Sequence, residues 1–259
     1  MELRDAARKL MAETEQATGC QVVVTEDATL TMMSGVVMAE ANRPGHIIRL
    51  HPKARALVDY YVAYYCGMIQ RFFENPPEER FLFAVGEKGR YQFRKLLERM
   101  PTYRRLGEAA IFAMCEQLLN GLMTHLRSTP LGIRLDNWIL SEHPEFVAMQ
   151  RTAIQPQIQE NNRSANDKFR SVCPPQVFDA TMAINAAFAQ FWADKWNQPE
   201  LALPYKASGY AAAGEKLLTI LKDMPDSGKT DRALIDAWGA ELNLTNGYVW
   251  IPYPGPQHA

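Results

Sequence analysis

The spacing of hydrophobic and polar positions varies along the chain, and in one stretch, Asp59–Phe72, apolar or aromatic residues fall on nearly every face of a helix. Nothing ends this run before Asn75-Pro76-Pro77, where two prolines break a helical pattern. A helix that is apolar on nearly every face is typical of the buried centre of a domain. We therefore predict that the rest of the chain packs around this segment, which we call the tyrosine-rich helix.

The chain before the tyrosine-rich helix combines one helix with several short strands. Residues 2–18 place apolar side chains at helical spacing, and Gly19 supplies a stop. Extended segments separated by Gly, Asn and Pro are then expected at residues 20–25, 30–33, 35–41 and 46–51. A small sheet of three or four strands is thus expected ahead of the tyrosine-rich helix.

The chain after Pro77 is predicted to be mostly helical. Helical spacing predicts helices at residues 78–84, 88–100, 103–127, 134–141, 143–160, 175–196, 208–222 and 231–241. Ser128–Gly132 is the best candidate for a domain boundary, and Tyr248–Tyr253 is expected to be extended. We predict an α-rich α+β protein, with a small sheet packed on a central helix in residues 1–128 and an all-helical part in residues 129–259.

The composition is that of an ordinary globular protein, with 47% hydrophobic and 22% charged residues in a chain of 259. A net charge of -1 gives no electrostatic sign of binding to nucleic acid or to an anionic membrane. The first residues predict an amphipathic helix without the apolar region of a secretory signal, no apolar segment reaches the length expected of a membrane span, and the cysteines form no CxxC pair. We therefore expect a cytoplasmic protein without a membrane partner.

The order of these elements resembles that of the ImmA/IrrE-like zinc metallopeptidases, a zincin family. The similar features are a helix, a small sheet ending in Gly45–Leu50, a short linker, and the tyrosine-rich helix running into Arg71-Phe72. Asn75–Arg80 is similar to the turn after the family helix, and Thr129–Trp138 together with Glu145–Gln150 is similar to the segment that follows the peptidase core in longer relatives. In that family the helix contains HExxH, whose two histidines bind Zn²⁺ while the glutamate acts as general base on the metal-bound water.

The sequence departs from the family at these positions, because Tyr64-Tyr65-Cys66-Gly67-Met68 occupies the place of HExxH. Tyr64 and Met68 replace both ligands, and neither a phenol nor a thioether is a normal Zn²⁺ ligand. Tyr65 cannot perform the proton chemistry of a carboxylate at neutral pH. The resemblance therefore implies a degenerate site, without catalytic residue, metal or cofactor, on a scaffold kept for binding. The competing interpretation is a buried aromatic helix in an unrelated α-rich domain.

A nucleophilic site is an alternative, because Cys66 lies on the tyrosine-rich helix and His46 and His51 lie near the strand before it. The protein would then be a hydrolase of another class; otherwise Cys66 is a buried thiol that fills core space. His46 and His51 are five residues apart and fall on opposite faces of a strand, which disfavours a shared metal ion. Ser227–Thr230 resembles the end of a P-loop, but Asp223 occupies the position of the earlier glycine, so Asp226–Thr230 predicts a turn and a helix N-cap.

Two sets of residues are candidates for contact with a partner. A basic stretch, interleaved with Glu98 and Glu108, suits an acidic protein face or a phosphate backbone, or else forms a solvated helix face; its members are Arg90, Arg94, Arg99, Arg104 and Arg105. C-terminal aromatic residues exceed what a small helical domain usually buries, which indicates an interface; the candidates are Trp192, Trp196 and Trp250. We predict a protein partner, in a role as subunit or regulator in a bacterial or mobile-element system, with a nucleic-acid-associated subunit as the weaker alternative.

Overall fold

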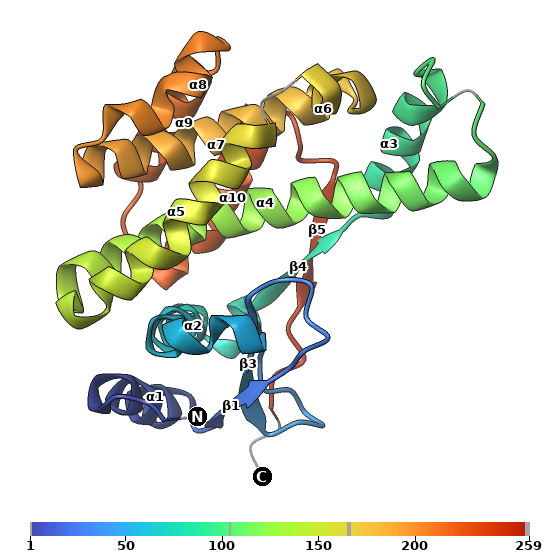
Figure 1. Ribbon diagram of the computed structural model, residues 1–259. Helices are drawn as coiled ribbons and strands as arrows, with labels where there is room; N and C mark the ends of the chain where they lie inside the picture. Colours follow the sequence, from blue (N-terminus) through green and yellow to red (C-terminus); the bar gives the residue numbers. More distant parts are fainter. Residues whose placement is uncertain (1, 104, 165–166, 257–259) are drawn as a thin grey trace.

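The computed structural model describes residues 2–103, 105–164 and 167–256, and it confirms a helix-rich α+β fold with two small sheets (Figure 1). The N-terminal elements lie at one end of the molecule, and the C-terminal helices pack together at the other. The long helix α4 (Glu108–Glu142) passes between them and contacts elements of both groups. None of the helices in these described ranges is long and apolar enough to cross a membrane.

The N-terminal group contains the predicted helix and a three-stranded sheet in the order β1-β3-β2. Strand β3 pairs parallel with β1 and antiparallel with β2. Alternate residues His46, Ile48 and Leu50 of β3 are buried, because side chains along a strand point to opposite faces and one face of this sheet is covered. The elements are α1 (Asp5–Thr18), β1 (Gln21–Glu26), β2 (Ser34–Val37), β3 (Gly45–Leu50) and α2 (Val58–Phe73).

Helix α2 is the tyrosine-rich helix, and it packs against both α1 and the sheet. Val62, Ala63 and Cys66 have no exposed surface, and they belong to one hydrophobic cluster with Val22 of β1 and Ile48 of β3. The predicted packing of a small sheet on a buried central helix is therefore confirmed. The expected strand at residues 30–33 is wrong, since these residues form bends, and β2 covers only the first part of the predicted segment 35–41.

Helix α4 is longer than predicted, because the expected break at Ser128–Gly132 does not occur. The two helices predicted at 103–127 and 134–141 are one helix that contains Pro130. A proline inside a helix costs about 3 kcal/mol, and here the buried face of α4 continues on both sides of it and packs against α2, α7 and α10. The division into residues 1–128 and 129–259 stays a prediction, and its boundary would lie inside this helix.

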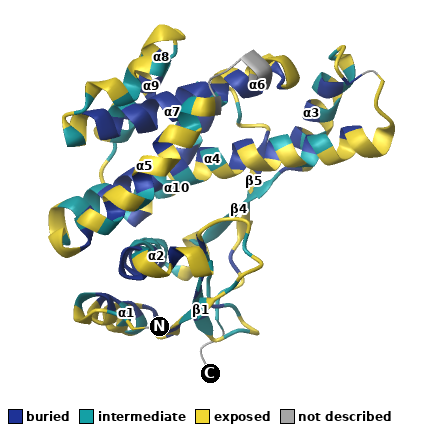
Figure 2. Ribbon diagram, in the orientation of Figure 1, coloured by how far each residue is buried: buried dark blue, intermediate teal, exposed yellow. Residues whose placement is uncertain are grey.

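The C-terminal helices surround α7, most of whose residues are buried (Figure 2). Gly214 of α9 lets the two helices approach closely, because a Cβ at this position would lie 2.7 Å from Cβ of Ala186 in α7. The predicted helices at 143–160, 175–196, 208–222 and 231–241 are confirmed with small shifts of their ends, and two short helices were not predicted. The observed helices are α5 (Val147–Ser164), α6 (Asp167–Val172), α7 (Pro175–Trp196), α8 (Leu203–Ala207), α9 (Ala211–Asp223) and α10 (Gly228–Glu241).

A second sheet joins two segments that are far apart in the sequence. Strand β4 (Phe81–Val85) pairs antiparallel with β5 (Tyr248–Pro252), so the helix predicted at 78–84 is wrong and the extended C-terminal segment is confirmed. Tyr253 continues past β5 and donates its phenol hydrogen to the carbonyl of Ala39. Helix α3 (Glu87–Arg99) follows β4 and packs along α4.

Buried apolar side chains form two clusters, and each draws residues from both sides of position 128. Ile139 and Phe146 join the cluster around α1, α2 and the first sheet. Phe93 and Leu97 of α3 join the larger cluster built on α4, α7, α9 and α10. Helix α4 therefore contributes buried side chains to both clusters and links them.

Candidate functional site

The tyrosines of α2 form a continuous aromatic contact along the helix. The ring centroids of Tyr60 and Tyr61 are 5.1 Å apart, those of Tyr60 and Tyr64 6.1 Å, and those of Tyr64 and Tyr65 5.3 Å. Such tilted and edge-to-face pairs are the favoured geometries of aromatic side chains. The cluster fills the space between α2, the first sheet and the C-terminal half of α4.

The three positions that the resemblance aligns with metal ligands and base are occupied by packing side chains. The hydroxyl of Tyr65 lies 3.0 Å from Oγ of Ser34 on β2, at hydrogen-bonding distance. The phenol oxygen of Tyr64 lies against Gly132 of α4, where a Cβ would be only 3.1 Å from it. Met68 packs, partly buried, against the N-terminal core. Burial raises the pKa of the Tyr64 and Tyr65 phenols above the ordinary value, so both are neutral at physiological pH.

A buried carboxyl group beside these tyrosines was not singled out from the sequence. Asp136 of α4 is only 4% exposed, and its Oδ1 accepts hydrogen bonds from the Tyr60 hydroxyl and from Nε2 of Gln150, both at 2.9 Å. The same Gln150 nitrogen donates to the backbone carbonyl of Asp136 at 2.8 Å. Burial raises the pKa of Asp136 to about 7, although both hydrogen bonds act to lower it. This polar group ties α2, α4 and α5 together.

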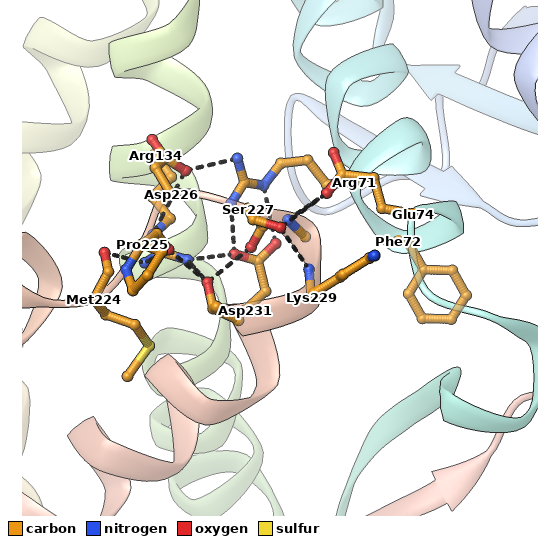
Figure 3. A network of polar contacts seen from close by, with 12 residues as sticks. Arg71, Phe72, Glu74, Arg134, Met224, Pro225, Asp226, Ser227, Lys229 and Asp231 are labelled. Atoms are coloured by element: carbon orange, nitrogen blue, oxygen red, sulfur yellow. Dashed lines mark hydrogen bonds and ion pairs between the residues drawn. The ribbon is translucent and has the colours of Figure 1, made fainter.

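A second polar network joins α2 and α4 to the start of α10 (Figure 3). Arg71 donates to both carboxylate oxygens of Asp231, from Nε at 2.9 Å and from Nη2 at 2.7 Å. Arg134, which is 2% exposed, donates from Nη1 to the same carboxylate at 2.9 Å. Nη1 of Arg71 also lies 2.7 Å from Asp226 in the loop between α9 and α10. Two arginines and two aspartates thus balance each other's charge at this junction.

The N-terminus of α10 is capped by side chains, as the sequence predicts for Asp226–Thr230. The Ser227 hydroxyl accepts from the backbone N–H of Lys229 at 3.2 Å, which makes Ser227 the N-cap. The carboxylate of Glu74, just past α2, accepts from the backbone N–H of Gly228 at 2.7 Å. An anionic group at this helix end is favourable because it meets the positive end of the helix dipole.

An open cavity of about 440 Å³ lies between α4, α7 and α9, beside Arg134. Its apolar lining comes from Ile133, Phe191, Leu218 and Leu221, and charged side chains of both signs surround it. Because basic and acidic groups are mixed at its edge, the cavity presents no single charge to a ligand. The charged lining residues are Arg134, Lys195, Lys222, Asp194, Glu215 and Asp226.

In the described part of the chain, Cys66, His46 and His51 each have other hydrogen-bond partners. Cys66 has no exposed surface, and burial raises the pKa of its thiol to about 11. His46 accepts a hydrogen bond from the backbone N–H of Ala39 and meets the ring of Phe73 edge to face. His51 accepts from the backbone N–H of Lys53. Among the described residues, no three His, Cys, Asp or Glu side chains are grouped so as to hold a metal ion.

The candidate binding residues lie in two separate groups, the arginines on α3 and the turn after it and the tryptophans on α7 and β5. Arg90 pairs with Glu116, and Arg94 pairs with Glu98 and Glu108, whereas Arg99 and Arg105 are exposed. Arg104 lies outside the described residues. The prediction that Trp192 belongs to a binding surface is wrong, because its side chain is fully buried in the larger core. The other two tryptophans are partly buried: Trp196 packs on Trp192 and under the guanidinium of Arg151, and Trp250 donates to Asp236.

No family model matches this chain, and neither the curated proteins nor the solved structures include a similar protein that a search detects. Function is therefore inferred from the residues and the geometry of the chain itself.

Proposed function

We propose that this chain is a catalytically inactive metallopeptidase-like protein that acts by binding another protein, as a subunit or regulator in a bacterial or mobile-element system. The observation that supports it most directly is the environment of Tyr65. In the position that the resemblance assigns to the general base, Tyr65 is a neutral phenol at hydrogen-bonding distance from Ser34 in the neighbouring sheet. The order of α1, a small sheet and α2 supports the underlying resemblance.

The chemistry of all three positions is unsuited to zinc hydrolysis. Two imidazoles one helical turn apart are replaced by the phenol of Tyr64 and the thioether of Met68. Both side chains pack against neighbouring elements, Tyr64 at Gly132 of α4 and Met68 in the N-terminal core. On this proposal, α2 serves as the packing centre that holds the scaffold in shape.

The alternative hydrolase with Cys66 as nucleophile has no comparable support. A reactive thiol needs a lowered pKa and access to the substrate. Cys66 is fully buried and the pKa of its thiol is raised, and its side-chain hydrogen bond is with Thr14.

Restoring the lost ligands tests the proposal. The variant Tyr64→His/Tyr65→Glu/Met68→His should bind one zinc ion per chain, measured by elemental analysis after dialysis against a mild chelator. Tyr64→His/Met68→His is a second variant that avoids a new buried carboxylate. The control Glu215→His/Lys216→Glu/Thr219→His places the same motif on exposed positions of α9 and should lose its zinc.

Two results would contradict the proposal. The first is wild-type protein that retains one zinc per chain after purification without chelator. The second is a pair of correctly folded α2 variants that hold zinc no better than the α9 control. The binding role itself predicts that affinity-tagged protein, isolated from its native host, retains a stoichiometric protein partner.

A further inference from the structure

Helix α3 and the beginning of α4 form an arm that extends away from the C-terminal helices (Figure 1). We define the arm as residues 87–116. Its inner face is apolar, since Phe93 and Leu97 of α3 are buried in the same cluster as Ile111 and Cys115 of α4. The Cys115 thiol also donates to the backbone carbonyl of Arg90 at 3.6 Å. The two helices of the arm therefore pack on each other, and the phenol of Tyr103 in the connecting turn also donates to the carbonyl of Val172 at the end of α6.

The outer face of α3 is a stripe of exposed basic and aromatic residues. Lys88, Tyr91, Lys95 and Arg99 follow one another at spacings of three and four residues, which places them on one side of a helix. All four are exposed, and Tyr91 is exposed by 66%. Two large apolar side chains are also exposed on the arm, namely Leu106 in the connecting turn and Phe112 at the beginning of α4, the second exposed by 57%.

Positive charge on the arm exceeds what its own acidic residues neutralise. Residues 87–116 contain seven Lys and Arg and four Asp and Glu, although the whole chain has a net charge of -1. Three of these acidic residues already form ion pairs within the arm. Glu98 pairs with Arg94 and Lys95, Glu108 pairs with Arg94, and Glu116 pairs with Arg90. In the described part of the chain, the structure gives no acidic partner to the exposed cations Lys88, Arg99 and Arg105.

We propose that the arm is the docking surface for an acidic segment of a partner protein that inserts an apolar side chain between the basic groups. This inference rests on the proposed binding function and places it at a defined surface. Exposed large apolar side chains beside unpaired cations suit a peptide of alternating acidic and apolar residues. A phosphate backbone fits less well, because it offers no apolar group to Phe112 and Leu106 and because the chain as a whole is slightly acidic.

The test uses the full chain and defined probes. One probe is a short fluorescent peptide in which Asp and Glu alternate with Phe and Leu; others are the same peptide with serine replacing the acids, and single-stranded and duplex oligonucleotides. Lys88→Glu/Arg99→Glu reverses the exposed charge, and Tyr91→Ala/Phe112→Ala removes the aromatic groups. Lys53→Glu/Lys206→Glu and Leu203→Ala/Val249→Ala are matched controls at exposed positions outside the arm.

The acidic peptide should bind the wild type, with an affinity that falls as the salt concentration rises. Each arm variant should weaken binding by about tenfold or more, while each control stays within about twofold of the wild type. Circular dichroism and thermal unfolding of every variant verify that the fold is unchanged. The serine peptide should bind at least about tenfold more weakly than the acidic one.

The proposal is overturned if the acidic peptide fails to bind, if it binds the arm variants as well as the wild type, or if the oligonucleotides bind more tightly and lose binding in the arm variants. The last result would make the arm a nucleic-acid surface. Zinc content is measured on the same samples and does not depend on the arm. A zinc-loaded wild type with an active arm would therefore reject the inactive-peptidase proposal alone.

Discussion

Arg134 and Asp231, 97 residues apart in the sequence, meet in a largely buried ion pair in which Nη1 of the arginine donates to Oδ1 of the aspartate at 2.9 Å. Arg71 of α2 binds the same carboxylate from the other side. Asp231 thus bridges two arginines, and Asp226 lies beside the same pair. Through Asp231, the tyrosine-rich helix, the long helix α4 and the C-terminal helices are fixed in one arrangement.

Replacing Asp231 should destabilise the protein strongly. The change Asp231→Ala leaves the half-exposed Asp226 as the remaining carboxylate beside Arg71 and the buried Arg134, and removing one partner of a buried pair costs about 3 kcal/mol or more. Chemical denaturation measures the free energy of unfolding. Glu160→Ala, which removes an exposed partner of Arg163, is the control and should change this free energy by less than about 1 kcal/mol. Equal effects of the two changes would show that the network does not hold the fold together.

Gly228 should not tolerate a side chain. It begins α10 beside the end of α2, and a Cβ there would overlap the backbone carbonyl of Arg71, lying 2.6 Å from the carbonyl carbon. Gly228→Ala must push the two helices apart and disturb the hydrogen bond to Glu74, so we expect a loss of about 2 kcal/mol or more in the free energy of unfolding. Gly121→Ala is the matched control.

Gly121 lies on the exposed side of α4, and a Cβ there would have no neighbour within 4 Å. Alanine is favoured over glycine in a helix by about 0.5–1 kcal/mol, so this control should stabilise the protein slightly. Opposite signs for the two substitutions, measured by thermal unfolding, are the expected result. A neutral effect at Gly228 would contradict the close approach of α10 to α2.

The elements that the sequence predicts well have local signals at their ends. Helix α7 has the predicted bounds because Pro175 begins it and Asn197, in the left-handed conformation with φ 52°, ends it. Strand β4 lacks such a signal, since five apolar residues in a row fit a buried strand or a helix equally well. Its strand conformation follows from pairing with β5 near the end of the chain, which the local sequence does not encode.

The polar groups of the candidate site cannot be predicted from the sequence for a related reason, since their partners are distant along the chain. Asp136 stands in an apolar helical stretch, and its partner Tyr60 is 76 residues away in the sequence. Arg134 likewise looks like an ordinary helix-surface residue until the loop before α10 packs against it. A charged residue between buried neighbours on a helix is a usable signal for such clusters. Because the sequence predicts a break near Pro130, it does not predict that Arg134 and Asp136 lie on one long helix with the residues before Pro130.

Asp136 should make stability depend on pH. Its folded pKa, about 7, lies above the value of about 3.9 for a free aspartate. Between these values the folded protein keeps the proton while the unfolded chain loses it, so the contribution of Asp136 to stability falls as pH rises from about 4 to 7 and is constant above that. The total is on the order of a few kcal/mol.

Asp136→Asn keeps an oxygen that accepts from Tyr60 and Gln150 but removes the titration. We expect a flatter profile of unfolding free energy against pH between 5 and 7, and a variant at least as stable as the wild type at pH 8. Asp223→Asn, at an exposed position, should leave the profile unchanged. An unaltered profile in Asp136→Asn would mean that this carboxyl is ionised in the folded protein.

Cys66 should be chemically inert in the folded protein. With a thiol pKa of about 11, only about one thousandth of the group is thiolate at pH 8, and the thiolate is the form that reacts. The side chain has no exposed surface, so an electrophile reaches it only when the structure opens. Iodoacetamide followed by peptide mass spectrometry should show no labelling of Cys66 in native conditions and full labelling in denaturant.

The remaining cysteines are internal controls, because Cys20, Cys115 and Cys173 are also buried and reduced. All four thiols should become reactive together as denaturant unfolds the protein, because burial in the folded structure protects each of them. Selective labelling of Cys66 in the native state, ahead of the other three, would instead indicate an activated thiol. That result would restore the hydrolase alternative and would count against a scaffold in which α2 has only a packing role.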